Sequence, residues 1–256
     1  AAVCALCIMH DINPILATFC GMLGGMLAGF VSGIMHTKMK IPALLTGIIT
    51  LTGLYSVNLL ILGSSNVYLS THETIVTMVA KLGLDRTSSV LLIGSVFVVL
   101  VILILYLFLN TQLGLALRAT GDNVAMGQAN GIKVDRMKIL GYMIGNGLIA
   151  LSGALLAQNN GYADLNMGVG TIVIGLASII LAEVIIKHLP LGKRLWSLVL
   201  GSVIYRLIIV FILTTDIEAQ MIKLVSAILL AVILYIPELR NKLGVRPSKT
   251  LTKEGD

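Results

Sequence analysis

The residues best able to bind a metal or act as nucleophiles are three cysteines and four histidines. Cys4 and Cys7 have the C-x-x-C spacing, but a zinc site needs a second pair of ligands and His10 alone does not supply one. The histidines lie at the ends of apolar segments or between them, and no Ser–His pair lies at one membrane depth, which argues against an intramembrane hydrolase. The one Gly-Lys pair, at 192–193, is followed by Arg194 and does not fit the phosphate-binding pattern G-x-x-x-x-G-K-[ST]. We therefore predict no catalytic residue, no metal site and no bound cofactor.

The composition indicates that most of this chain lies in a lipid bilayer. Apolar residues make up 57% and charged residues 12%, against about 25% charged residues in ordinary soluble proteins. Such a chain cannot cover a soluble surface, which excludes a soluble enzyme, a disordered tail and a nucleic-acid-binding domain. A membrane barrel would show alternating segments of about ten residues instead of long apolar blocks. The fold class predicted is an all-α polytopic membrane protein.

Seven apolar blocks are long enough to cross a bilayer as helices. A shorter apolar block over 1–9 precedes them, so we expect a bundle of about eight or more transmembrane helices in one domain, 1–256, and a missing N-terminal stretch. The seven predicted spans are 13–36, 42–62, 88–110, 138–158, 168–187, 195–214 and 219–236.

The basic residues orient these spans. Of the 18 Lys and Arg, 14 lie in one set of connecting segments and two, Lys81 and Arg86, lie in the opposite set. Because cytoplasmic loops carry the excess of Lys and Arg, the set with 14 faces the cytoplasm. The cytoplasmic segments predicted are 36–41, 111–137, 188–194 and the C-terminal tail 237–256.

The first full span carries four glycines at strict i+4 spacing: Gly21, Gly25, Gly29 and Gly33. Such a face allows another helix to approach to backbone contact. Close packing is favoured over the alternative, a wall of a substrate path. Gly141 and Gly145 repeat the spacing in the 138–158 span, which makes that span a candidate partner.

The outer segment 63–87 is too long for a simple turn and predicts a short surface helix. Ser70 and Glu73 fit a capping box, and Gly83 is a suitable helix stop. This helix either covers the bundle or docks an external binding protein, and the sequence does not decide between them. Its apolar face is formed by Ile75, Val79 and Leu82.

The cytoplasmic segment 111–137 predicts a second short helix, capped by Asp122 and stopped by Gly131. About two turns, roughly 12 Å, lie between these residues. An isolated helix of that length is marginal in water, so another surface must hold it. Contact with another protein is favoured over packing on its own bundle. The apolar residues that offer such a contact are Val124, Ala125, Met126, Ala129 and Ile132.

Polar residues inside spans are candidates for a transport pathway. Arg206 lies near mid-membrane, where an arginine costs at least about 2.5–3.5 kcal/mol on insertion scales. Glu183 is the nearest acidic candidate partner. Structural pairing of Arg206 and a site for an anionic group are equally consistent with the sequence. Asn58 and Asn146 are mid-span amides, which more often join helices by hydrogen bonds than contact a solute.

Several motifs resemble the permease subunits of bacterial ATP-binding-cassette importers, in the branch that serves branched-chain amino acids, ribose and related solutes. The motifs are Arg118 to Ile132, Val134 to Lys138 and Ala150 to Leu155. The segments 36–41 and 166–177 are further similar to a sub-branch for tryptophan or tyrosine. The resemblance covers most of 13–236 and is strongest over 112–183. The chain departs from the family pattern at Val124, where Pro is frequent, and at Asn130, where Leu is frequent.

The resemblance implies an import permease in the bacterial cytoplasmic membrane that moves a small solute, an aromatic amino acid by sub-branch, by alternating access. It also implies that the helix near Asp122, Asn123 and Val124 is a coupling helix, seated on a separate ATPase subunit that binds the ATP. The implied partners are a second permease copy, two ATPase subunits and an extracellular solute-binding protein, in membrane lipid and without nucleic acid. The alternatives are a self-contained secondary transporter or channel, and the same importer with a sugar or nucleoside as its solute.

Overall fold

The computed structural model describes residues 1–81, 83, 85–168, 171–185, 190–214, 224, 227–231 and 235 of the 256-residue chain. The chain divides into two compact units, 1–167 and 168–256, and each is described by itself. The single domain predicted over 1–256 stays a prediction. The elements of the first unit are α1 (Ala2–Met9), α2 (Pro14–Thr37), α3 (Ala43–Leu62), β1 (Asn66–Tyr68), α4 (Ile75–Ala80), α5 (Arg86–Leu109), α6 (Gln112–Asp122), α7 (Val124–Ala129), α8 (Val134–Asn160) and β2 (Tyr162–Asp164).

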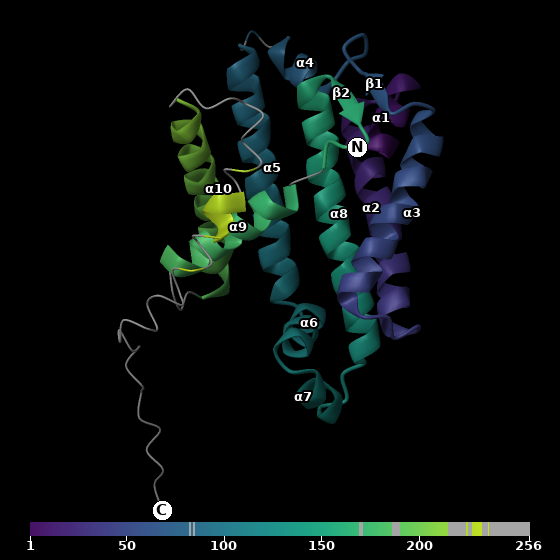
Figure 1. The fold of residues 1–256 in the computed structure, drawn as a ribbon, viewed down its shortest axis with the longest axis vertical. Coiled ribbons are helices and arrows are strands. Elements are labelled where there is room, and N and C mark those ends of the chain that lie inside the picture. The colour runs from purple at the N-terminus through teal and green to yellow at the C-terminus, as the bar shows by residue number, and fades with distance from the viewer. Residues whose placement is uncertain are drawn as a thin grey trace, which may run out of the picture. The chain divides into compact units, whose positions relative to one another are not determined.

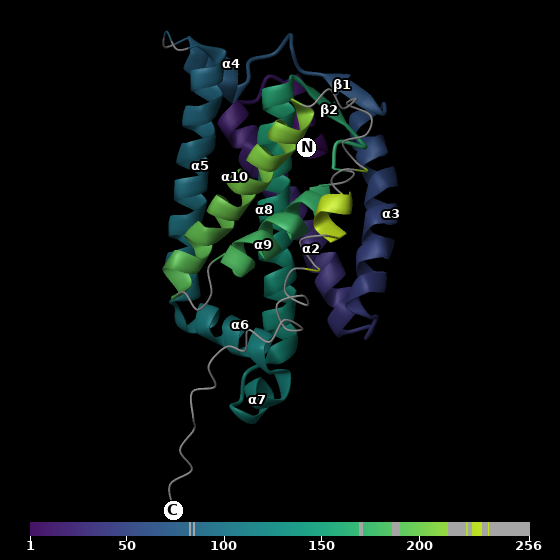
Figure 2. The same ribbon diagram turned by 60° about the vertical axis from the view of Figure 1, so that its left-hand side comes forward.

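Helices α2 and α8 form the central pair of the first unit and run side by side along their length (Figures 1 and 2). Helix α8 has 27 residues, which corresponds to about 40 Å. It begins at Val134, four residues earlier than the span predicted from 138. Helix α3 joins the other side of α2, where Ser32 Oγ and Thr50 Oγ1 are 2.9 Å apart.

Short elements lie at the two ends of this pair. Helices α6 and α7 lie at the end where α8 begins, whereas α4, β1 and β2 lie at the end where α8 finishes (Figures 1 and 2). The strands pair antiparallel with Val67 opposite Ala163, and Leu69 N donates to Gly161 O over 2.8 Å. This ribbon adds two short strands to a fold that is otherwise helical, as the sequence predicts.

Local sequence explains where the long helices start and stop. Asn13 caps α2 by accepting from Ile15 N at 3.0 Å, and Pro14 follows at the first helical position, where its missing N–H costs nothing. Helices α3 and α8 end at Gly63 and Gly161, which have φ of 70° and 75°. Glycine adopts a positive φ without a Cβ clash. At both positions the chain can therefore leave the helix sharply and turn toward the β-ribbon.

Among the described residues, five helices are long and apolar enough to cross a membrane: α2, α3, α5, α8 and α10. The first four agree with predicted spans to within a few residues at most ends. The predicted span 168–187 contains α9 (Thr171–Ile185), a helix of 15 residues. The predicted span 219–236 and the tail 237–256 lie largely or wholly outside the described residues.

The second unit is built on α9 and α10 (Leu191–Leu213). Gly201 of α10 sits against α9, where an added Cβ would overlap the carbonyl oxygen of Ser178 and come within 2.7 Å of Ala182 Cβ. Tyr205 is buried between these helices. At the surface, Arg194 donates to Glu183 over 3.1 Å, so the two helices are also joined by an ion pair.

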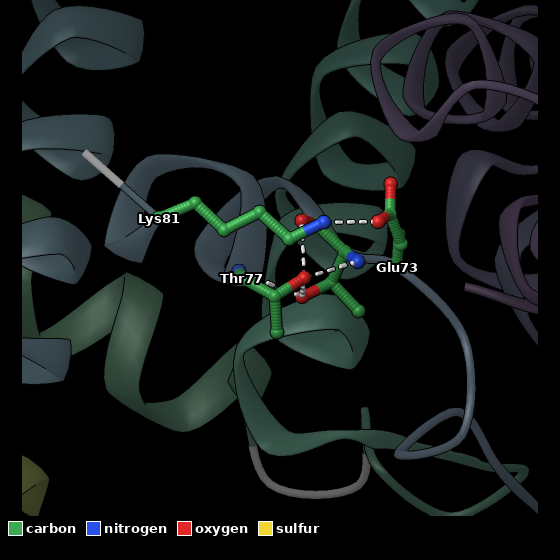
Figure 3. A network of polar contacts seen from close by, with 4 residues as sticks. Glu73, Thr77 and Lys81 are labelled. Carbon is green, nitrogen blue, oxygen red and sulfur yellow. Dashed lines mark hydrogen bonds and ion pairs between the residues drawn. The ribbon is translucent and has the colours of Figure 1, made fainter.

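The outer helix α4 starts four residues later than its predicted capping box requires. Its N-cap is Thr74, whose hydroxyl accepts from Thr77 N at 3.2 Å, while Thr77 Oγ1 accepts from Thr74 N at 2.8 Å. Ser70 is therefore not the cap, and Glu73 instead forms an ion pair with Lys81 across the helix (Figure 3). The predicted stop at Gly83 is confirmed, with φ of 88°.

Candidate functional site

Helix α7 is the short helix expected in segment 111–137, but its cap is Asn123. Asn123 Oδ1 accepts from Met126 N at 3.1 Å, and its backbone is extended, with φ −153° and ψ 109°. Asp122 is the last residue of α6, so the prediction that Asp122 caps the helix is wrong. A capping residue needs non-helical backbone angles, and only Asn123, between the two helices, has them.

The end of α7 follows the prediction. Gly131 has φ of 76°, the left-handed conformation that suits glycine after a helix. Asn130 Nδ2 donates to Met126 O over 2.9 Å, and Ile132 N donates to Gly127 O over 3.0 Å. The last carbonyls of the helix are therefore bonded, so its two turns are closed at both ends.

Helix α7 packs against the rest of the chain through one residue, Gly127. Gly127 is buried, and a Cβ added there would lie 3.6 Å from Val134 Cγ2 and 3.8 Å from Thr120 Oγ1. Thr120 on α6 and Val134 on α8 are themselves buried. Two neighbouring helices thus fix the position of α7 without covering its larger side chains.

The apolar side chains of α7 itself are exposed. Met126 is 65% and Val124 39% exposed, and Ala125 and Ala129 are exposed beside them, while Ile132 is half-buried. Apolar side chains on a two-turn helix do not stabilise it when they face water. Among the residues that the structure describes, none covers this face, which marks it as a contact surface.

Helix α6 is a functional element that the sequence analysis did not identify. Thr111 Oγ1 accepts from Gly114 N at 3.2 Å and so caps it. Gly114 sits against the end of α5, where an added Cβ would overlap Phe108 O. Leu117 Cδ1 is 3.4 Å from the position of a Cβ on Gly141 of α8. The signal available in the sequence was Thr111, a good N-cap directly after an apolar span.

The four glycines of α2 face α8 and α1. A Cβ on Gly25 would overlap Ala150 Cβ and come within 2.7 Å of Asn146 O. A Cβ on Gly29 would overlap Tyr142 O and lie 2.9 Å from Met143 Cα, and one on Gly33 would lie 2.9 Å from Ile139 Cα. Gly21 is less tight, 3.3 Å from Cys4 Cβ and 3.4 Å from Ala154 Cβ. This face is a packing surface between backbones, and among the described residues it borders no open path.

The glycines of α8 do not complete this contact. Gly145 has nothing within 4 Å of an added Cβ, and Gly141 faces Leu117 of α6. The glycine of α8 that faces α2 is Gly147, where a Cβ would lie 2.7 Å from Met26 Cγ. The i+4 spacing therefore indicates the correct partner helix for α2. The two glycines that it marks on α8, Gly141 and Gly145, are not the residues in contact with α2.

The three candidate pathway residues lie in two units, Asn58 and Asn146 in the first and Arg206 in the second, and each is described by itself. Arg206 is exposed on α10, and among the described residues no acidic side chain pairs with it, since Glu183 binds Arg194. Asn146 Nδ2 donates to Tyr142 O over 2.9 Å within its own helix instead of joining two helices. Asn58 is half-buried on α3. Their role in a pathway stays a prediction.

Residues 1–236 match the model of a family described as "Branched-chain amino acid transport system / permease component". The chain is 38% identical over 253 residues to a "Tyrosine transport system permease protein" of Clostridioides difficile, covering 99% of this chain and 83% of that protein. It is 32% identical to an uncharacterized protein of Rickettsia prowazekii, over 82% of this chain and 74% of that one.

A more distant relative has a different solute in its name. The "Autoinducer 2 import system permease protein LsrC" of Photorhabdus laumondii is 28% identical over 64% of this chain and 47% of its own length. No solved structure matches the chain significantly. Of the relatives described here, the permease of a tyrosine transport system is more similar to this chain than LsrC.

Proposed function

This chain belongs to the family of permease components of branched-chain amino acid transport systems, and from that premise we propose how it couples to ATP and which solute it moves. It is a multi-pass membrane protein and the permease component of an ATP-binding-cassette transport system, a transport subunit and not an enzyme. In our proposal it works as a pair of permeases with two ATPase subunits and an extracellular solute-binding protein. Solute crosses by alternating access, powered by those ATPases.

The single observation that carries this proposal is the exposed apolar face of α7. Met126 and Val124 project from a helix that α6 and α8 fix through Gly127. A rigidly placed helix with an uncovered apolar face fits a groove on a partner, the recurring helix-in-groove mode of recognition. Because only residues 130–133 separate α7 from the long helix α8, a displacement of α7 by the partner is passed to that span through a short connection.

The orientation follows from charge. The basic residues near α7, namely Arg118, Lys133, Arg136 and Lys138, support a cytoplasmic position for this end, and the C-terminus is proposed to lie on the same side. The opposite end, with α4 and the β-ribbon, then faces the external binding protein. The membrane is the bacterial cytoplasmic membrane, where ATP is available on the α7 side.

The solute proposed is an aromatic amino acid, tyrosine or tryptophan. The support is the 38% identity to a tyrosine transport permease over nearly the whole chain, combined with the motifs at 36–41 and 166–177. A self-contained secondary transporter usually places paired charges or broken helices at mid-membrane. Within the described residues Arg206 has no acidic partner, which supports ATP-driven import over ion coupling. Sugar-like solutes are the second candidate, because a more distant relative has autoinducer 2 in its name.

The experiment that tests the coupling role changes Met126 to Asp. A charge at the centre of an apolar contact must be desolvated on binding, so the variant should bind the ATPase subunit at least about tenfold more weakly, a cost of 1.4 kcal/mol. The matched control is Met39→Asp, a methionine 63% exposed on the α2–α3 turn. Binding is measured by co-purification and by ATP hydrolysis stimulated by solute and binding protein. An equal loss of ATPase binding in both variants, or a loss in neither, would show that α7 is not the contact with the ATPase subunit.

A further inference from the structure

Gln158, two residues before the end of α8, is a buried amide bonded to three other helices. It is 3% exposed. Its Oε1 accepts from Ile75 N of α4 at 3.0 Å, and its Nε2 donates to Thr18 Oγ1 of α2 over 2.7 Å. The same nitrogen lies 3.4 Å from Cys4 Sγ of α1. Both ends of one side chain are thus engaged, and each end contacts a different element.

The bond to Ile75 has a specific function in α4. The first N–H groups of any helix have no partner inside the helix. The hydroxyl of Thr74 satisfies Thr77 N, and Gln158 satisfies Ile75 N, so the buried start of α4 depends on a residue 83 positions away in sequence. A buried N–H without a partner is costly, which gives this contact more weight than an exposed one.

Apolar packing joins the same two helices. Ile75 and Val76 are buried against Ile93 of α5, with Leu155 of α8 packed on this cluster. The ion pair between Glu73 and Lys81, by contrast, lies on the exposed side (Figure 3), and exposed ion pairs contribute little. The attachment of α4 to the bundle therefore comes from Gln158 and its apolar neighbours.

Gln158 also belongs to a pair of helices that cannot easily slide past each other. Its partner Thr18 is on α2, which contacts the backbone of α8 at Gly25, Gly29 and Gly33. A helix pair with such contacts moves as one body, because its backbones leave no slack. The same α8 begins next to α7, so one rigid pair reaches from the coupling helix to the base of α4.

We propose that Gln158 is a positioning residue that makes the outer helix α4 move with the α2–α8 pair when the permease changes its access. This inference rests on the proposed transport function. Displacement of α8 by the partner at α7 is passed to the outer face through the Gln158–Ile75 bond. Without that bond, α4 keeps its apolar contacts but no longer moves together with α8.

The test compares Gln158→Leu, which loses both bonds, with Gln158→Glu, which keeps an oxygen to accept from Ile75 N. Asn159→Ala is the control, because in the described structure no hydrogen bond to the Asn159 side chain is found. The first readout is hydrogen exchange at Ile75 in the purified permease. The second is ATP hydrolysis by the permease assembled with its ATPases, with and without binding protein and solute.

We expect exchange at Ile75 to be at least about tenfold faster in Gln158→Leu and close to wild type in the other two variants. Stimulated hydrolysis should fall severalfold in Gln158→Leu alone, while basal hydrolysis stays unchanged. Unchanged exchange at Ile75 in Gln158→Leu would overturn the inference. Faster exchange with fully stimulated ATP hydrolysis would also overturn it, since Gln158 would then have only a structural role. Failure of the proposed function would show differently, as wild-type hydrolysis that does not respond to binding protein and solute, and exchange would still decide whether Gln158 fixes α4.

Discussion

Gly29 of α2 lies directly against the carbonyl oxygen of Tyr142 on α8, so that a Cβ at position 29 would overlap that oxygen. The neighbouring Met143 Cα would be 2.9 Å away, closer than real Cβ contacts come. Both obstacles are backbone atoms, which cannot rotate aside as a side chain can. The contact therefore sets the spacing of the two central helices and with it the geometry of the first unit.

We predict that Gly29→Ala destabilises the permease by about 1–3 kcal/mol, the range for inserting a methyl group into a filled core. The effect is measured as the thermal unfolding midpoint and the yield of purified protein in detergent.

Gly145→Ala is the matched control for this prediction. Gly145 lies on α8 with nothing within 4 Å of an added Cβ, and alanine favours a helix over glycine by about 1 kcal/mol. The control should be as stable as wild type or more so. Equal behaviour of Gly29→Ala and Gly145→Ala would mean that the two helices are not in backbone contact.

The glycine spacing in α2 predicted this contact because a period of four places all its members on one face, whatever the partner. The residues of α8 that contact these glycines could not be predicted from the sequence. The backbone at Tyr142 and the small side chain of Ala150 make the close approach, whereas Gly145 faces open space. Which small residue of the second helix meets the first depends on the crossing of the two helices, which is a property of the packed pair and not of either sequence.

The cap of α7 gives a prediction that separates two adjacent residues. Asn123→Ala removes the acceptor for Met126 N and should cost about 0.5–2 kcal/mol of local helix stability. Asp122→Asn keeps the shape of the side chain at a helical position. It removes only a negative charge near the start of α7 and should destabilise that helix by no more than about 0.3–1 kcal/mol. Hydrogen exchange over 124–131 measures both. A larger effect at Asp122 than at Asn123 would contradict the structure.

The sequence contains both capping candidates, and each is a residue type that caps well. What decides between them is where α6 ends. Helix α6 extends through Asp122, so Asp122 keeps helical angles and only Asn123 is free to become extended. Because α6 itself was not predicted, its C-terminal end could not be used to place the cap.

The outer helix offers the same kind of test. Thr74→Val removes the hydroxyl that accepts from Thr77 N at almost constant volume, and should destabilise α4 by about 0.5–2 kcal/mol. Ser70→Ala changes an exposed residue outside the helix and should have no measurable effect. The thermal midpoint and the exchange of amides 75–81 report the difference, and a larger loss from Ser70→Ala would restore the earlier capping box.

Contacts between residues far apart in sequence explain most of what could not be predicted at the outer end. The ribbon pairs Val67 with Ala163, and Gln158 reaches Ile75. Strands of three residues carry too little alternation to be recognised, and one glutamine near the end of a span looks like an interfacial residue. Both gain their role only after α3, α4 and α8 have been brought together by the fold.

The final prediction concerns transport itself. Purified permease, reconstituted in vesicles with its ATPases and binding protein, should import tyrosine or tryptophan only when ATP is supplied on the α7 side. Uptake should continue after the proton gradient is collapsed, because the proposed energy source is ATP bound by the partner ATPase subunits.

Each component of this experiment has its own control. Met126→Asp should abolish uptake without changing vesicle insertion, since the substitution acts at the partner surface and not in the membrane. Uptake by the permease alone under a proton or sodium gradient would refute the ATP-driven mechanism. Uptake of ribose-like solutes but not of aromatic amino acids would refute only the solute, because α7, its cap at Asn123 and its support at Gly127 do not depend on what passes through the spans.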